Sequence, residues 1–255
     1  MCYEGDSAPP VPSISGAAIS HDDLVLEAVD GNRFAAFSAT PGEPAGAGSG
    51  AGVVILPDVR GLYRFYEELA LRFAERGYPA VAIDYFGRTA GTGKRDDDFE
   101  YMPHVEETTA DGIQEDVAAA VAHLRDRGHA PVVTVGFCFG GRQSWLATAA
   151  GHGLAGAVGF YGRPGLGRDG SPGPTQRAAE LQGPILGLMG GDDPGIPVEE
   201  VDAFEAALDL AGVENEIHVY PGAPHSFFDR KQEQFAADSE DAWNRVLAFL
   251  ERAAA

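Results

Sequence analysis

The chain has 255 residues, of which 44% are hydrophobic and 22% are charged, a composition typical of a globular protein with a well-buried core. Its net charge of −21 makes nucleic acid and anionic membrane surfaces poor partners. No apolar run approaches the roughly 18 residues of a membrane span, and the N-terminus lacks a secretory signal. We therefore expect no membrane association and a cytoplasmic location.

The sequence predicts a mobile lead-in over residues 1–20, followed by one domain over residues 21–255. A hairpin is expected around Asp30-Gly31-Asn32, followed by a loop rich in Gly, Ala and Pro at 40–52. Beyond that loop, strands and helices alternate, apart from a charged insert at 86–109 without clear periodicity. The predicted strands are 53–56, 80–83, 131–135, 155–160, 184–189 and 216–220, and the predicted helices are 65–76, 111–127, 142–150, 198–211 and 232–252.

This alternation predicts an α/β fold, with a doubly wound, mostly parallel sheet and helices on both faces. In such sheets the chemistry gathers at the carboxyl ends of the strands. The last predicted strand, 216–220, alternates in polarity and is expected near an edge of the sheet.

The segment Gly136-Phe137-Cys138-Phe139-Gly140-Gly141 follows an apolar strand and precedes a helix. This is the context of the nucleophile elbow G-x-S-x-G, with cysteine in the place of serine. Flanking glycines are needed because side chains there would clash with the neighbouring strand and helix. A thiol at a helix N-terminus is favoured as the thiolate. We therefore interpret Cys138 as a nucleophile rather than as a small hydrophobic core residue.

Two further strand ends carry possible partners for this cysteine. The strand at 184–189 is followed by Asp192 and Asp193, which compete for one role, and a Gly-x-x-Asp spacing from Gly190 favours Asp193. The strand at 216–220 is followed by His225, for which a surface loop histidine is the alternative. Nucleophile, acid and histidine is the chain order of α/β-hydrolases. In these enzymes the histidine takes the proton of the nucleophile, and the acid orients the histidine.

Together, Gly-Phe-Cys-Phe-Gly-Gly, Gly-Gly-x-Asp-x-x-Ile-Pro, Pro-His-Ser-Phe and the Gly-Phe-Tyr-Gly of 159–162 resemble the dienelactone hydrolase family of cysteine-dependent α/β-hydrolases. The resemblance covers roughly residues 20–250. It implies a catalytic triad of Cys138, Asp193 and His225, acting on a small lactone or carboxylic ester through a thioester acyl-enzyme.

The family usually has a glutamate after its first long core strand, which interacts with the resting cysteine. The matching residue here is Asp58, one methylene shorter, with a loop carboxylate paired to Arg60 as the alternative. The resemblance further implies that the backbone N–H groups of Val59 and Phe139 form the oxyanion hole.

Dienelactone hydrolases proper bind the substrate carboxylate with two arginines, and this chain has no arginine at either of the matching positions. Asp229 stands at the second of them, with Arg230 beside it, and the insert has no arginine at the expected place. We therefore favour a general carboxylic-ester or lactone hydrolase, with dienelactone a poor substrate and carboxymethylenebutenolidase activity the less favoured alternative. Residues considered for substrate binding are Arg60, Tyr161, Phe227 and Arg230, with Arg88, Arg142 and Arg163 as other arginines that could substitute. The alternative for the aromatic residues is that they pack in the core. The alternative for the arginines is that they are solvated surface charges.

Two other classes of function compete with hydrolysis. One is a thiol redox sensor, for which Cys2 is the only other cysteine available. The other is a non-catalytic ligand-binding protein that keeps the fold. No spacing typical of a metal site or of a phosphate-binding loop occurs, so we expect no metal and no cofactor. We expect a monomer or a small homo-oligomer.

Overall fold

The computed structural model describes residues 8–42, 50–96, 98–229 and 231–255. In this part of the chain, an eight-stranded sheet has the order β1-β2-β4-β3-β5-β6-β7-β8. The strands from β4 to β8 in this order run parallel, and β1 and β2 add an antiparallel pair at one edge. The strands are β1 Ile19–Glu27, β2 Arg33–Pro41, β3 Gly52–Leu56, β4 Ala80–Ile83, β5 Val132–Phe137, β6 Gly156–Phe160, β7 Ile185–Gly190 and β8 Asn215–Tyr220.

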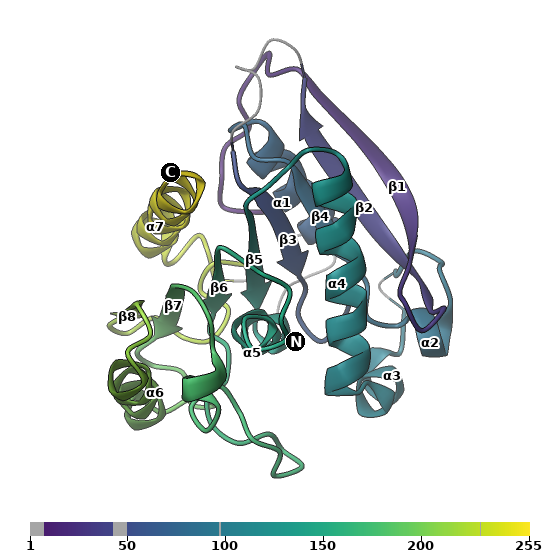
Figure 1. Cartoon of the computed structure of the whole chain (residues 1–255). Coiled ribbons are helices and arrows are strands. Elements are labelled where there is room, and N and C mark those ends of the chain that lie inside the picture. The colour runs from purple at the N-terminus through teal and green to yellow at the C-terminus, as the bar shows by residue number, and fades with distance from the viewer. Residues whose placement is uncertain (1–7, 43–49, 97, 230) are drawn as a thin grey trace.

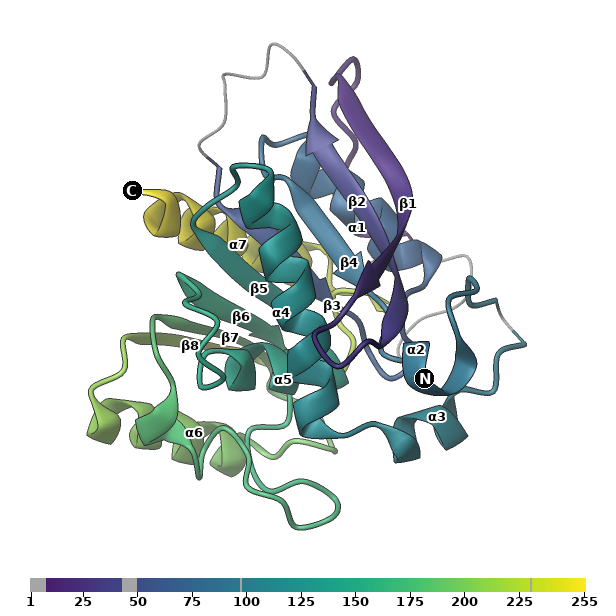
Figure 2. The same ribbon diagram turned by 45° about the vertical axis from the view of Figure 1, so that its right-hand side comes forward.

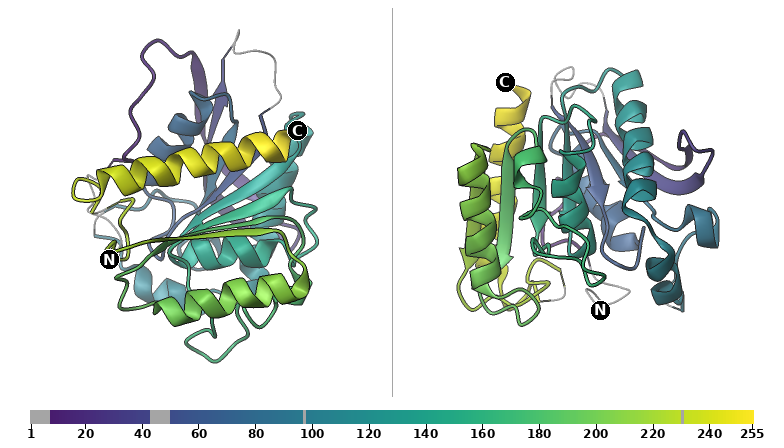
Figure 3. Two further views of the ribbon diagram at one scale, coloured as in Figure 1. Left: turned by 90° about the vertical axis from the view of Figure 1, so that its left-hand side faces the viewer. Right: turned by 60° about the horizontal axis from the view of Figure 1, so that its bottom comes forward.

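Helices cover both faces of the sheet, so the predicted doubly wound α/β fold is confirmed (Figure 1). The long helix α7 lies across one face, on which α1 also packs, and α6 lies on the other face with α4 and α5 (Figure 3). The helices are α1 Arg64–Ala74, α2 Gly87–Ala90, α3 Tyr101–Glu107, α4 Ala110–Asp126, α5 Phe139–Ala147, η1 Ala178–Glu180, α6 Val198–Ala211 and α7 Ala236–Ala254.

The central strands are buried on both faces, which explains their continuous apolar sequence. Every residue of β3 and of β4 is buried. The covering helices are apolar on one stripe only; in α4, for instance, Ile113, Val117, Val121 and Leu124 recur at helical spacing and are buried. The rigid layers thus fix where the strand ends point. None of the helices in the described ranges has the length and apolar composition needed to cross a bilayer.

Most predicted elements are found, and the main differences are in the lead-in and in the insert. The hairpin is present, but β1 begins at Ile19, inside the predicted lead-in. Residues 1–7 of that lead-in lie outside the described residues, and Val11, only 5% exposed, packs in the core. The insert at 86–109 contains α2, which lies near the β1–β2 hairpin, and α3, which lies near the N-terminal end of α4 (Figure 2). These helices have 4 and 7 residues, too few to produce a recognisable apolar stripe. Strand β8 is at the edge, as predicted.

Candidate active site

Cys138 occupies a strained turn between β5 and α5. Its φ of 53° and ψ of −112° lie outside the regions that non-glycine residues ordinarily adopt. The neighbouring glycines are required sterically, because a Cβ at Gly136 would overlap the Gly140 carbonyl oxygen. A Cβ at Gly140 would overlap the carbonyl oxygens of Leu56 and Pro57. The turn therefore holds a half-buried thiol at the N-terminus of α5, tightly against the chain that leaves β3.

His225 and Asp193 form a short hydrogen-bonded pair. The Nδ1 atom of His225 lies 2.6 Å from Oδ2 of Asp193. The Asp193 side chain is 2% exposed and that of His225 is 31% exposed, so the acid lies beneath a histidine that reaches the surface. The second carboxylate oxygen of Asp193 accepts the Gly195 N–H at 2.8 Å, which fixes its orientation. Asp192, by contrast, is exposed.

The strand ends bring this pair towards the cysteine. Strands β5, β6, β7 and β8 are neighbours in the sheet, and Cys138 donates its backbone N–H to the Phe160 carbonyl at the end of β6, at 2.9 Å. The next residue, Tyr161, places its ring centroid 4.9 Å from that of His225. Cys138, Asp193 and His225 thus follow three different strands and lie at the carboxyl end of the parallel sheet.

The loop at 57–62 after β3 lies on the other side of the elbow. Asp58 is fully buried, and its Oδ1 atom accepts the Arg60 N–H at 2.8 Å, which closes the turn on itself. Burial raises the pKa of Tyr85 well above its usual range, and the nearby charges of Asp58, Asp84 and Cys138 add to this shift. Asp58 and Cys138 therefore act on the same buried phenol.

The arginines proposed for substrate contact are held in different ways. Arg88 forms ion pairs with Asp30 and Asp116. The guanidinium of Arg142 donates to carbonyl oxygens of the loop at 163–172, and that of Arg163 donates to the Gly195 carbonyl. Arg60 lies near two aromatic rings, 5.6 Å from the centroid of Tyr63 and 5.9 Å from that of Tyr101. Arg230 lies outside the described residues.

The two aromatic residues proposed for substrate contact are both fully buried. Tyr161 donates its hydroxyl to Oδ2 of Asp229 at 2.9 Å, and Asp229 is 1% exposed. The ring of Phe227 packs against those of Tyr161 and Tyr220, at centroid distances of 5.7 and 4.9 Å. The carboxylate at position 229 thus orients a tyrosine beside His225, and Phe227 fills the core beneath them.

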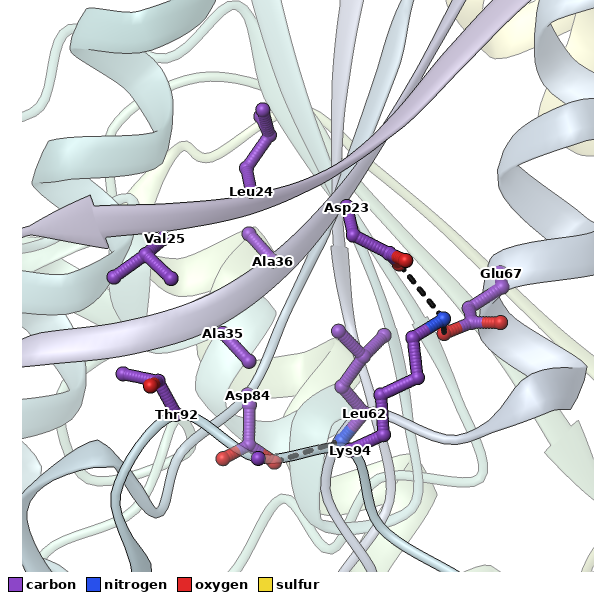
Figure 4. A pocket seen from close by; sticks show the side chains of 11 residues that line it. Asp23, Leu24, Val25, Ala35, Ala36, Leu62, Glu67, Asp84, Thr92 and Lys94 are labelled. Atoms are coloured by element: carbon purple, nitrogen blue, oxygen red, sulfur yellow. Dashed lines mark hydrogen bonds and ion pairs between the residues drawn. The ribbon is translucent and has the colours of Figure 1, made fainter.

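Two cavities lie away from the cysteine. One, of about 110 Å³, lies between the β1–β2 hairpin and the segment around Lys94, which pairs with Asp23 and Glu67 (Figure 4). The other, of about 300 Å³, lies beside α4 and α5 and is lined by Gln114, Gln143 and His152 among others. Cys138, Asp193 and His225 line neither cavity. Within the described residues, no group of three or more His, Cys, Asp or Glu side chains could hold a metal ion.

Three residues beside the site were not anticipated. The hydroxyl of Tyr66 accepts the Asp58 N–H, and that of Tyr85 donates to the Pro57 carbonyl oxygen. The carboxylate of Asp84 accepts the Leu62 N–H at 3.0 Å (Figure 4). Asp84 also forms a buried ion pair with Arg95 at 2.8 Å. No motif marks these residues; the only sequence signal is a polar residue directly after the apolar strand β4.

The parallel sheet, the elbow after β5 and the histidine–aspartate pair at neighbouring strand ends define an α/β-hydrolase fold. A sequence profile of the dienelactone hydrolase family matches residues 34–254, and the chain belongs to this family of hydrolases.

The similarity extends over whole chains. A carboxymethylenebutenolidase of Rhodococcus opacus is 33% identical over 266 aligned positions, which cover 99% of this chain and 97% of the relative. A solved candidate dienelactone hydrolase from Klebsiella pneumoniae has a TM-score of 0.79 and 25% identity, covering 92% of this chain and 99% of its own. A dienelactone hydrolase-like promiscuous phosphotriesterase, P91, from metagenomic libraries shares the fold at a TM-score of 0.75 and 22% identity, with 93% and 99% coverage.

Proposed function

We propose that the protein is a cysteine-dependent hydrolase of a small neutral lactone or carboxylic ester, with Cys138, Asp193 and His225 as the triad. The observation that carries the proposal is the 2.6 Å contact between His225 and buried Asp193. This pair follows β7 and β8 at the carboxyl end of the strands, and Cys138 follows β5 at the same end of the sheet. A histidine oriented in this way can take the thiol proton and return it later.

The reaction proceeds in two halves. His225 accepts the proton of Cys138, and the sulfur attacks the carbonyl carbon of the substrate to form a tetrahedral oxyanion. Collapse breaks the ester C–O bond, the departing alkoxide takes the proton from His225, and a thioester remains. Water then attacks the thioester with His225 as base, releasing the acid and restoring the thiol. With a lactone, the alcohol and the acid leave as one hydroxy acid.

The loop at 57–62 supports an oxyanion hole. The N–H groups of Asp58, Arg60, Gly61 and Leu62 each donate to an acceptor, whereas that of Val59 has no acceptor among the described residues. Phe139 is the first residue of α5, so its N–H has no acceptor within the helix. A pair of free N–H groups beside the nucleophile is what a developing oxyanion requires.

The positions of three described arginines support a neutral substrate. Arg88, Arg142 and Arg163 are bound to carboxylates or carbonyl groups elsewhere, and a carboxylate stands at position 229. Recognition of an anionic substrate needs a bidentate arginine in a defined place. A free thiol nucleophile also suits the reducing cytoplasm.

Turnover of p-nitrophenyl acetate by the wild-type protein and by Cys138→Ala tests the proposal. We expect Cys138→Ala to lose turnover, and iodoacetamide to inactivate the wild type with the label on Cys138. A redox sensor or a non-catalytic binder would show no turnover in either protein. Full activity in Cys138→Ala would contradict the proposal.

A further inference from the structure

Two tyrosines from different elements bind the two polar atoms of one peptide bond. The hydroxyl of Tyr85, just after β4, donates to the Pro57 carbonyl oxygen at 2.8 Å. The hydroxyl of Tyr66, on α1, accepts the Asp58 N–H at 3.0 Å. These are the C=O and the N–H of the same Pro57–Asp58 peptide, so its plane cannot turn without breaking a buried hydrogen bond.

Both phenols are fixed by their surroundings. Tyr66 is fully buried and Tyr85 is 2% exposed, so neither hydroxyl can exchange its partner for bulk water at no cost. Burial, together with the charges of Asp58, Asp84 and Cys138, raises the pKa of Tyr85 well above its usual range. Tyr85 therefore remains a protonated donor throughout the neutral pH range.

The same two rings pack on the residues that flank the nucleophile. The ring centroid of Tyr66 lies 5.6 Å from that of Phe137, and the ring centroid of Tyr85 lies 5.4 Å from that of Phe139. Phe139 supplies one of the two N–H groups of the proposed oxyanion hole. The other belongs to Val59, which directly follows the peptide that the tyrosines hold. Tyr85 thus packs on Phe139, and both tyrosines bind the peptide that precedes Val59.

The far end of the loop is fixed independently. Asp84 accepts the Leu62 N–H at 3.0 Å and the Phe86 N–H at 3.0 Å. The loop is therefore held before Val59 by Tyr66 and Tyr85 and after it by Asp84. Val59 lies between these anchors.

We propose that Tyr66 and Tyr85 are positioning residues that fix the Pro57–Asp58 peptide and thereby aim the Val59 N–H at the carbonyl oxygen of the substrate. The inference rests on the proposed function, since it assigns the structural support of the same oxyanion hole. It predicts that either hydroxyl contributes to the stabilisation of the oxyanion and not to the reactivity of the thiol.

The variants Tyr66→Phe and Tyr85→Phe test this inference. We expect each to lower kcat on p-nitrophenyl acetate about tenfold with little change in KM, less than the 10²–10³-fold loss typical when a donor is removed outright. Inhibition by an aryl trifluoromethyl ketone should weaken by about the same factor, because its adduct with the thiolate carries an oxyanion. Alkylation of Cys138 by iodoacetamide should stay within about twofold, since substitution at a saturated carbon forms no oxyanion.

Tyr220→Phe is the matched control. It removes the hydroxyl of a buried tyrosine, which donates to Asp241 of α7 at 2.8 Å. We expect kcat, inhibition and alkylation all to stay near the wild-type values. Circular dichroism at the assay temperature shows whether each variant is folded, and the two tyrosines give two independent tests.

Three results would overturn the inference: kcat within twofold of wild type in both variants, a fall in alkylation parallel to that in kcat, or loss of the fold in both, which would indicate a structural role. Failure of the proposed function is distinguishable, because it appears as full turnover in Cys138→Ala, whatever the tyrosine variants do.

Discussion

The two sides of the candidate active site are held in place in different ways. On one side, Cys138, Asp193 and His225 each follow a strand of the parallel sheet, so backbone pairing of β5, β7 and β8 brings them to the same end of the sheet. On the other side, the loop at 57–62 is held by side chains from other elements, chiefly Tyr66, Tyr85 and Asp84. The comparison shows that the sheet brings the candidate triad to one end of the strands, where hydrogen bonds of Asp193 complete the placement, whereas the loop at 57–62 depends on side chains from other elements.

The largest expected effect comes from the side held by the sheet. Asp193→Asn should lower kcat by about 10⁴-fold, because an amide in place of the carboxylate favours the wrong tautomer of His225. The measurement is ester turnover at neutral pH. Asp192→Asn is the matched control, and its activity should stay within about twofold, since Asp192 is exposed. A comparable loss in Asp192→Asn alone would reverse the assignment of the acid.

The anchors of the loop predict the next largest effect, on stability. Arg95→Met should lower the free energy of unfolding by about 3–5 kcal/mol, because it leaves the buried charge of Asp84 without its ionic partner. The side chains of Arg95 and Asp84 are 5% and 0% exposed.

Urea denaturation measures this loss, with Arg64→Met as the control. Arg64 pairs with Glu68 on the surface of α1, its side chain 68% exposed, and such pairs contribute no more than about 0.5 kcal/mol. Equal losses in the two variants would mean that the Asp84–Arg95 pair does not anchor the loop.

The same contrast explains what could be predicted from the sequence. The fold follows from local periodicity, and the elbow is recognisable because strand, turn and helix are contiguous. Tyr85 forms a hydrogen bond with a residue 28 positions away, which the sequence does not indicate. In the sequence, Tyr66 cannot be told apart from the other buried residues of an amphipathic helix. Asp229 could be noted as a departure from the family, but its hydrogen bond to Tyr161 spans 68 positions. Contacts of this kind exist only after the chain has folded.

A smaller effect concerns the substrate, on which both sides of the site act. We expect kcat/KM for p-nitrophenyl butyrate to exceed that for p-nitrophenyl hydrogen succinate by about tenfold, since no bidentate contact is expected for the free carboxylate. The net charge of −21 also repels anions at long range, but salt screens this beyond about 8 Å at 0.15 M.

Raising the salt concentration separates these two causes. Added NaCl should improve turnover of the anionic ester modestly and leave that of the neutral ester unchanged. A preference for the anionic ester at all salt concentrations would contradict the prediction, and Arg60 and Arg230 would then be the first residues to replace.

The smallest expected effect joins the two sides of the site, through Asp58. A carboxylate near the cysteine disfavours the thiolate, so Asp58→Asn should accelerate alkylation of Cys138 at neutral pH by about fivefold, which corresponds to roughly 1 kcal/mol of charge repulsion. The substitution keeps a carbonyl oxygen that can still accept the Arg60 N–H, so the turn at 58–61 should persist. Asp192→Asn serves again as the control, since it removes one negative charge at an exposed position. Alkylation rates are compared from pH 5 to pH 10. If both variants follow the wild-type profile, Asp58 only shapes the loop, and the charge of the resting cysteine is set by its own side of the site, through His225 and the N-terminus of α5.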